Sequence, residues 1–526
     1  MSPGPECVST EPVAWWASVT ALSGIPLAPL LITDVPPVLD YPNHLARLVL
    51  LAAGPGDPVL GRIFTPEWTI IPNLAGDVIG LGLLHLLPIH AAGRCLLGGV
   101  LLLNLAGVLT LHRALFGRRS CWPPGSGLVA YNSTFLLGFL NWRIGRGLAM
   151  PCAAGWMVWR ERRPLATIAG AMAASILLFF CHFVGLVFFL VLIGAAELRA
   201  MRNFHALLVR SAGLLAMLAG PILLSTLTTS RDAPAAMQWP PAHVKLENAA
   251  SPFINYVFPL DMISAVLVYG GIALGVAFGW LVVAPRAVPA VVVLPVAWFV
   301  LPFDLMGGSF LDMRVTVMLG FLVFAAVDRS RVEHHVAYRV TAAACIVLFT
   351  VRMAVVAWVW TGHRHDLSEL RAVIATVPPT AKVYFPNVSQ EEAPAYWDAG
   401  PRARRLSNGL RADYHLPALL LIERGAFWPV LFANPAQQPI YSRPACARLA
   451  REAHDIPSHA ELVADPDLAL PALVDFDYVL LLEAGADPDL ANFIPRCLTL
   501  VSRSDFAALF KVTGDAPDRA SRTGLH

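Results

Sequence analysis

The chain has 526 residues, of which 56% are hydrophobic and only 14% are charged. Soluble proteins carry about 25% charged residues, so this composition excludes a protein that is water-soluble over its whole length. The formal net charge of +2 is too small to indicate a nucleic-acid partner, and the sequence has no Walker loop, Rossmann glycine motif or zinc-type Cys/His spacing.

The charge deficit lies in residues 1–362, where apolar runs of about 20 residues predict membrane-spanning helices. The first run, Trp15 to Thr33, has no basic region before it and no small-residue cleavage site after it, so it is a spanning helix and not a signal peptide. About eleven spans are predicted in this way. They lie near residues 13–33, 92–112, 124–140, 147–159, 165–181, 183–198, 207–228, 262–284, 287–303, 313–327 and 338–361.

Residues 70–89 decide the topology. They are apolar but contain Asn73, Asp77, His85 and two prolines. If they lie flat at the membrane surface, the basic turns all fall on one side, which the positive-inside rule makes cytoplasmic. We therefore predict an interfacial helix over 70–89, a cytoplasmic N-terminus and an extracytoplasmic C-terminus in the cell (inner) membrane. The basic turns are Arg113/Arg118/Arg119, Arg160/Arg162/Arg163, Arg199/Arg202, Arg286 and Arg329/Arg331/Arg339.

The predicted fold is an α-helical multi-pass membrane protein with a small extracytoplasmic α/β domain at residues 363–513. A helix at 366–376, strands at 382–385 and 478–482, and a last helix-then-strand segment at 506–512 make up that domain. Its cysteines, Cys446 and Cys497, could pair in an oxidising compartment. The polar tail 514–526 is predicted to be disordered. The other external segments are the long first loop 34–91, the turn at 141–146, the turn at His182, and the loops 229–261 and 304–312.

Polar residues gather in the first loop, where Asp40, Asn43, His44 and Arg47 fall within eight positions. On a helix that begins near Asn43, which would cap it, His44 and Arg47 share one face. The alternative is an interfacial loop whose polar side chains simply meet water and lipid headgroups.

Three further groups stand in the predicted external segments. Arg143 and Arg146 lie on the side that the positive-inside rule leaves poor in cations, so they either bind an anion such as a lipid phosphate or snorkel to headgroups. His182, where two spans meet, is a functional candidate or a hydrogen-bonded structural histidine. Asp312 and Arg314 form either a local salt bridge at a helix start or a phosphate clamp. Together these groups indicate chemistry at the membrane surface on a lipid-linked, phosphate-bearing substrate.

The layout resembles the GT-C superfamily of membrane glycosyltransferases. The run Asp40-Tyr-Pro-Asn-His44-Leu-Ala-Arg47 is similar to the acidic motif in the first external loop of bacterial members. Ala91-Ala-Gly-Arg94, with the apolar span after it, and Leu137-Gly-Phe-Leu-Asn141 resemble further segments of the same group. The resemblance covers roughly residues 12–330. Here Asp40 is followed by Tyr-Pro with no second acid beside it, so a divalent cation is left open.

The resemblance implies transfer of a sugar from a polyprenyl-phosphate carrier in the membrane to a lipid, glycan or protein acceptor. Asp40 would be the general base, and His44 or His182 would orient substrate. The departing phosphate would meet Arg314, Arg143, Arg146 or Lys245, in that order. Trp239 or Trp68 would stack on the sugar. The remaining candidates for substrate binding are Asn43, Arg47 and Asp312.

Two other classes of function fit the same composition. A transporter or flippase of lipid-linked glycans needs polar groups deep within several spans, and Arg352 is the main charge found there. A non-catalytic membrane assembly protein would use 363–526 as a binding module, and the cluster of Asp, His and Arg would be incidental.

Overall fold

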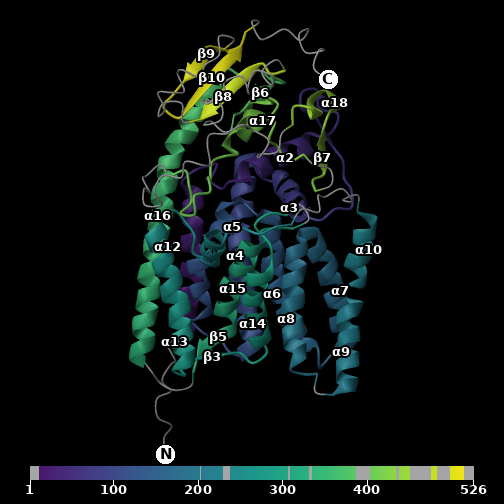
Figure 1. The fold of residues 1–526 in the computed structure, drawn as a ribbon, viewed down its shortest axis with the longest axis vertical. Coiled ribbons are helices and arrows are strands. Elements are labelled where there is room, and N and C mark those ends of the chain that lie inside the picture. The colour runs from purple at the N-terminus through teal and green to yellow at the C-terminus, as the bar shows by residue number, and fades with distance from the viewer. Residues whose placement is uncertain are drawn as a thin grey trace, which may run out of the picture. The chain divides into compact units, whose positions relative to one another are not determined.

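A computed structural model describes residues 11–201, 203–228, 237–305, 308–330, 335–386, 403–433, 437–450, 475–482 and 498–513. The chain forms two compact units. The helical unit comprises Met1–Leu31, Pro72–Gly76 and Cys95–Ala357, and the mixed unit comprises Ile32–Ile71, Asp77–Arg94 and Trp358–His526. Each is described by itself below (Figure 1).

Among the described residues, five helical stretches are long and apolar enough to cross a membrane. They are Ile89–Phe116, Pro164–Cys181, Phe204–Leu227, Phe258–Ala277 and Val340–Ile374. Shorter apolar helices cover Trp15–Leu31, Ala75–Leu84, Phe183–Leu198 and Val288–Val300. These stretches coincide with most of the predicted spans, and the multi-pass helical fold is confirmed.

The helical unit is built from helices and two small two-stranded sheets. Its helices are α1 (Glu11–Gly24), η1 (Ile25–Leu31), α4 (Ile89–Phe116), η3 (Pro123–Val129), α5 (Ser133–Leu136), α6 (Leu140–Trp159), α7 (Pro164–Cys181), α8 (Phe183–Leu198), α9 (Phe204–Ala216), α10 (Ala219–Leu227), α11 (Ala242–Ala249), α12 (Phe258–Ala265), η4 (Val266–Gly270), α13 (Gly271–Ala277), α14 (Val288–Val300), α15 (Leu311–Ala326) and α16 (His335–Ile374). Antiparallel pairs join β2 (Met237–Gln238) to β4 (Asp304–Leu305) and β3 (Leu281–Val283) to β5 (Val327–Arg329).

The prediction of a helical span over 124–140 is wrong. The segment holds only η3 and the four-residue α5, both buried. It runs antiparallel to α15 over that helix's whole length: Trp122 packs on Phe324 near one end, and Phe139 packs on Phe310 at the other. Because irregular backbone is tolerated at membrane depth when protein surrounds it, the segment can pass from one end of the unit to the other without being a helix.

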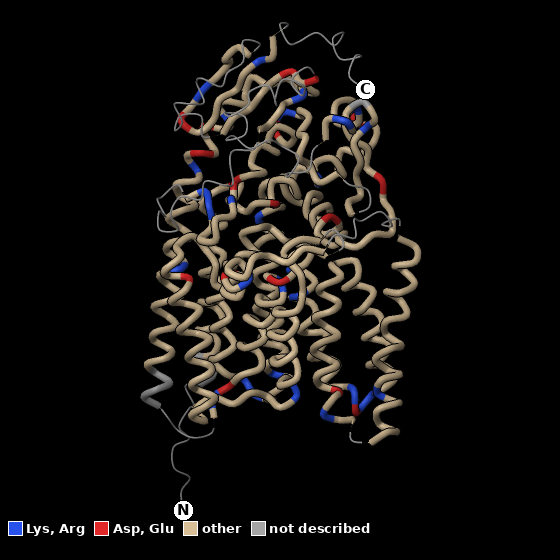
Figure 2. The backbone as a smooth tube through the Cα atoms, in the orientation of Figure 1, with Lys and Arg blue, Asp and Glu red and all other residues tan. Residues whose placement is uncertain are grey.

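The basic turns gather at one end of the helical unit, as the topology prediction requires. Arg118 pairs with Asp328 just after α15, 2.7 Å away, and Arg286 donates to the carbonyl of Met157 near the end of α6. Figure 2 shows Lys and Arg concentrated at the end of this unit where Figure 1 places β3 and β5. The identification of this end as cytoplasmic remains a prediction.

Residues 70–89 form no spanning helix. Before α4 begins at Ile89, this stretch contains the helix α3 (Ala75–Leu84), whose 10 residues reach about 15 Å at 1.5 Å per residue, half the thickness of a bilayer core. Its start is fastened within the helical unit, because Gly76 N donates to the side-chain oxygen of Asn141 and Leu74 N donates to Phe180 O.

The mixed unit joins the first loop to the C-terminal region. It contains α2 (Tyr41–Ala53), η2 (Leu60–Arg62), η5 (Leu416–Ala418), α17 (Leu419–Arg424) and α18 (Pro444–Ala447). Strand β1 (Phe64–Pro66) from the first loop pairs antiparallel with β7 (Ile440–Ser442). The loop and the C-terminal region therefore share one fold, which the predicted division at residue 362 does not anticipate.

The predicted strands of the C-terminal region lie in one four-stranded sheet of order β6-β8-β10-β9. Strands β6 (Val383–Tyr384) and β8 (Tyr478–Leu482) are parallel, whereas β10 (Ala507–Val512) pairs antiparallel with both β8 and β9 (Leu498–Arg503). The helix expected at 366–376 is the end of the 40-residue α16. The predictions for Cys497 and for the tail 514–526 lie outside the described residues.

Candidate functional site

The polar cluster of the first loop lies on α2 of the mixed unit. Asp40 occupies the N-cap position and Pro42 stands in the first turn, where the missing N–H costs no hydrogen bond. The prediction that Asn43 caps this helix is wrong, because its side chain is buried in the unit. Asn43 donates to Val430 O at 3.0 Å and accepts from the indole Nε1 of Trp428 at 2.8 Å.

The Asp40 carboxylate faces an imidazole. Its Oδ1 lies 3.2 Å from Nδ1 of His415, and the two side chains are 15% and 6% exposed. The His415 ring packs edge-on against Phe432 and Tyr414, with centroid distances of 5.2 and 5.1 Å. The carboxylate makes no hydrogen bond to the start of α2. A partly open carboxylate beside an imidazole, walled by aromatic rings, can accept a proton from a bound hydroxyl.

His44 and Arg47 share one face of α2, as their spacing predicts. Arg47 Nη2 lies 2.9 Å from His44 Nδ1, and Arg47 Nε donates to Asp77 Oδ1 at 2.7 Å. Because a guanidinium only donates, Nδ1 of His44 is the acceptor and its proton is on Nε2. Burial raises the pKa of Asp77, and the charge of Arg47 opposes that rise. Arg47 therefore holds His44 in place instead of facing a ligand.

Asp34, six residues before Asp40, belongs to a different ion-pair network. It accepts two hydrogen bonds from Arg371, which also binds Glu423. Burial alone would raise the pKa of Asp34, but the hydrogen bonds and charge of Arg371 outweigh it and lower that pKa below its ordinary value. Asp34 is thus held ionised in an ion pair, whereas Asp40 faces an imidazole.

In the helical unit, the structure brings His182 and Arg314 together. His182 separates α7 from α8, and its Nδ1 accepts from Val184 N at 3.0 Å. Its Nε2 lies 2.9 Å from Nη1 of Arg314, whose guanidinium covers the ring of Phe139. A neutral imidazole has one acceptor nitrogen, yet two N–H donors point at its two nitrogens. An oxyanion that accepts from both Arg314 and His182 Nε2 would resolve this conflict.

Asp312 and Lys245 also meet in the helical unit. The buried Asp312 carboxylate accepts from Asn248 at 3.0 Å and lies 3.7 Å from Lys245 Nζ. Lys245 donates to Leu301 O as well. These groups tie α11 to the start of α15. Trp239 keeps 58% of its surface exposed, so its ring face is open to a ligand.

Arg143 and Arg146 are not in an external turn, because residues 141–146 form the first turns of α6. Both are fully buried. Arg143 donates to the side chain of Asn132 and to Ala130 O, while Arg146 donates twice to the side-chain oxygen of Asn104. Helix α6 begins earlier than predicted because this polar turn finds neutral partners inside the bundle.

Sequence reasoning missed the groups that complete these contacts. His415 and Trp428 lie in the C-terminal region, and nothing in their spacing links them to a loop more than 370 residues away. The sequence marks Asp77 only as a charged residue within 70–89. Within the ranges described, no three His, Cys, Asp or Glu residues lie close enough to hold a metal ion.

No protein-family model and no curated protein sequence matches the chain. Among solved structures it is similar to ArnT from Cupriavidus metallidurans bound to undecaprenyl phosphate, with a TM-score of 0.54 and 10% identity over 97% of this chain and 100% of that one. The apo state of the same protein gives a TM-score of 0.44 with 12% identity, over 96% of each chain. The chain therefore has the fold of this ArnT structure, and its apolar helices are those of a multi-pass membrane protein.

Proposed function

We propose that this protein is a membrane glycosyltransferase that moves a sugar from a polyprenyl-phosphate donor to a lipid, glycan or protein hydroxyl on the extracytoplasmic face. The observation that carries the proposal is the Asp40 carboxylate, half-buried beside His415, in a chain whose fold matches a protein solved with undecaprenyl phosphate. The end of the helical unit that bears the basic turns is then cytoplasmic.

Asp40 acts as the general base of the transfer. The acceptor hydroxyl gives its proton to the carboxylate while its oxygen attacks the anomeric carbon of the sugar. The bond from that carbon to the phosphate oxygen breaks, and the electron pair leaves on the polyprenyl phosphate. His415 lies beside the carboxylate, with its Nδ1 3.2 Å from Asp40 Oδ1, and His44, fixed by Arg47, contributes a donor at Nε2.

Arg314 and His182 supply donors suited to the departing phosphate. Negative charge rises on the phosphate as the bond breaks, so donors aimed at it stabilise the transition state more than the ground state. Arg314 Nη1 and His182 Nε2 both carry a hydrogen and face each other, and a phosphate oxygen that accepts from both removes this conflict. Arg143, Arg146 and Lys245 follow Arg314 as candidates, because each already donates to groups of the protein and the two arginines are fully buried. Trp239 offers an exposed ring for the sugar.

The test is transfer by the purified full chain in proteoliposomes, with a panel of labelled undecaprenyl-phosphate sugars and extracted lipid or glycan acceptors. Asp40→Asn keeps the shape of the side chain and removes the base, so the rate should fall about 10²- to 10⁴-fold. Asp34→Asn is the matched control, since it removes a nearby carboxylate that is held by Arg371. Full transfer by folded Asp40→Asn protein would refute the assignment of the base.

A further inference from the structure

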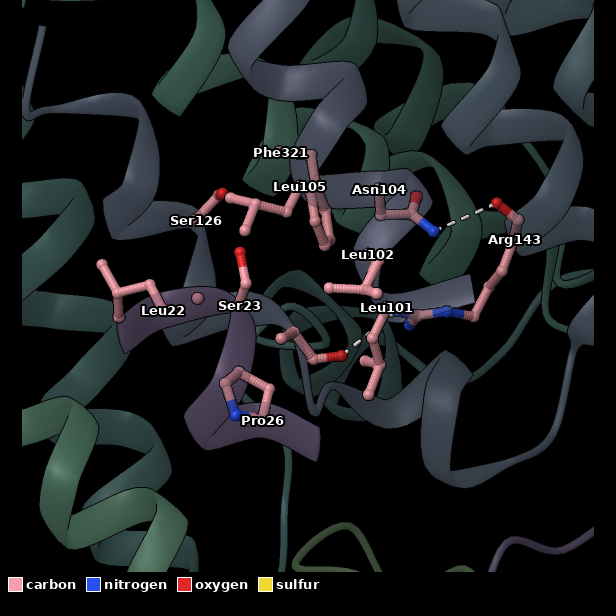
Figure 3. A pocket seen from close by; sticks show the side chains of 12 residues that line it. Leu22, Ser23, Pro26, Leu101, Leu102, Asn104, Leu105, Ser126, Arg143 and Phe321 are labelled. Atoms are coloured by element: carbon pink, nitrogen blue, oxygen red, sulfur yellow. Dashed lines mark hydrogen bonds between the residues drawn. The ribbon is translucent and has the colours of Figure 1, made fainter. Parts of the chain in front are cut away.

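The helical unit has cavities of very different size. An enclosed cavity between α1, α4, η3 and α6 (Figure 3) has a volume of about 10 Å³, which is room for one water molecule and for no larger ligand. An open hollow of about 430 Å³ lies where the turn after α4 meets β3 and β5. Ligand sites in proteins commonly measure about 300–1,000 Å³, so this hollow is large enough for a ligand. It is lined by Phe116, Arg118, Val282, Arg329 and Ser330.

The charged side chains that line the hollow are two arginines. Arg118 is held by Asp328, because its Nε and Nη2 lie 2.9 and 2.7 Å from Oδ2 of that carboxylate. Arg118 Nη2 also donates to Arg329 O at 3.0 Å, so the two arginines are neighbours. The Asp328 carboxylate is fully buried, where it also accepts from the Ser120 hydroxyl and from Arg329 N. Because Asp328 does not line the hollow, its wall is positively charged.

Arg118 keeps donors that are available to a ligand. Its side chain is 42% exposed, and within the described ranges Nη1 donates to no acceptor. A guanidinium bound through Nε and Nη2 is held in one orientation, so the Nη1 hydrogens are fixed as well. Arg329 is exposed at the end of β5. Guanidinium groups are the donors that proteins use most for bidentate binding of phosphate oxygens, so a phosphate group is the ligand that this wall fits.

The surroundings of the hollow are those of a membrane interface. Ser330 N donates to Trp280 O at 2.8 Å, so Trp280 stands next to the hollow, and its ring stacks on Phe278 with centroids 5.3 Å apart. Both rings are exposed. Exposed tryptophan rings and arginines together mark the depth at which a spanning bundle meets lipid headgroups. Phe116 and Val282 give the hollow an apolar side, which a free phosphate ion would leave uncovered.

We propose that the hollow binds the phosphodiester headgroup of an anionic phospholipid, such as phosphatidylglycerol. Arg118 and Arg329 donate to the phosphate oxygens, and the glycerol and first acyl carbons of the lipid contact Phe116 and Val282. Basic pockets at the ends of spanning helices suit such headgroups. The hollow lies at the end of the helical unit that bears the basic turns (Figure 2).

This site is separate from the groups proposed above for the donor phosphate. Arg314 lies in the first turn of α15, whereas Asp328 and Arg329 follow the end of that helix. The 16 residues of α15 are about 24 Å long, so one phosphate cannot contact both places. The lipid site therefore does not depend on the proposed sugar transfer.

The first test is the thermal stability of the purified full chain in detergent with added lipid. Phosphatidylglycerol should raise the apparent Tm along a saturating curve, because it binds the folded state. Zwitterionic phosphatidylcholine and inorganic phosphate should give no saturating rise over the same concentrations. An equal rise with phosphatidylcholine would show general solvation by lipid, and an equal rise with inorganic phosphate would show a site for the free ion. Either result would overturn the proposal.

Matched arginine variants locate the site. Arg329→Gln removes one cation from the hollow but keeps an exposed polar side chain on β5, and the half-saturating concentration of phosphatidylglycerol should rise about tenfold or more. Arg162→Gln is the control, since this exposed arginine belongs to another basic turn and does not line the hollow. Equal changes in both variants would contradict the assignment.

Native mass spectrometry gives a second reading that does not depend on stability. The chain released from nanodiscs of equal phosphatidylglycerol and phosphatidylcholine should retain phosphatidylglycerol, and Arg329→Gln should retain much less of it than Arg162→Gln. Equal retention by the two variants would refute the lipid site.

Discussion

Arg47→Met tests whether the cluster on α2 is held by a buried ion pair. The Arg47 and Asp77 side chains are only 1% and 2% exposed, and Nε lies 2.7 Å from Oδ1. Removing one partner of such a pair leaves a buried charge, which costs about 3–5 kcal/mol of stability. Arg62→Met on η2 is the control, because that exposed arginine should contribute within about 0.5 kcal/mol.

The double variant Arg47→Met/Asp77→Leu distinguishes the cost of an uncompensated charge from the cost of lost packing. Replacing both partners by apolar residues of similar size is often close to neutral, so most of the loss should be recovered. Chemical denaturation in detergent, followed by tryptophan fluorescence, gives all three free energies. A double variant as unstable as Arg47→Met would refute the explanation by an uncompensated charge.

The pH dependence gives an independent check. Burial raises the pKa of Asp77, and removing Arg47 takes away the charge that opposes this rise. A carboxyl whose pKa is higher in the folded state binds its proton more tightly there, so its contribution to stability is present at low pH and is lost as pH rises through that pKa. The deficit of Arg47→Met should therefore be smaller at pH 5 than at pH 7.5. An equal deficit at both values would contradict a buried carboxylate.

Three further substitutions probe other contacts by the same unfolding assay. Trp428→Phe removes the donor to Asn43 and leaves a buried acceptor, for a loss of about 1–3 kcal/mol, whereas exposed Trp68→Phe should change little. Arg352→Met in the helical unit should cost about 3–5 kcal/mol by stranding the buried Asp261, and Asp261→Asn in the same chain should recover part of it. Gly320→Ala places a Cβ 2.7 Å from Pro252 Cβ and should cost about 1–3 kcal/mol, whereas Gly99→Ala meets open space.

Apolar runs proved sufficient to locate most helices, because a spanning helix must be apolar along its length. The prediction of a helix at 124–140 failed for a physical reason. The side chains of this run are apolar because protein encloses them, and its backbone needs no continuous helix there. Hydropathy reports burial in an apolar medium and does not distinguish lipid from the protein interior.

The local part of the candidate site followed from spacing, whereas its long-range part did not. The three-residue offset of His44 and Arg47 predicts their contact on α2. The pairing of Asp40 with His415 spans 375 positions and depends on how the first loop and the C-terminal region fold together, as β1 and β7 show. The sequence predicts an external turn for Arg143 and Arg146, because charged side chains usually lie at surfaces, whereas the structure buries both.

The most direct test of the proposed function identifies the lipid product. Purified protein in proteoliposomes is given a doubly labelled undecaprenyl-phosphate sugar, with one label in the sugar and one in the lipid, together with the acceptor fraction. The account predicts one undecaprenyl phosphate released for each sugar transferred, because the bond from the anomeric carbon to oxygen breaks and the phosphate stays on the lipid. Movement of intact donor across the bilayer without release of undecaprenyl phosphate would show a transporter and would contradict the proposed transfer.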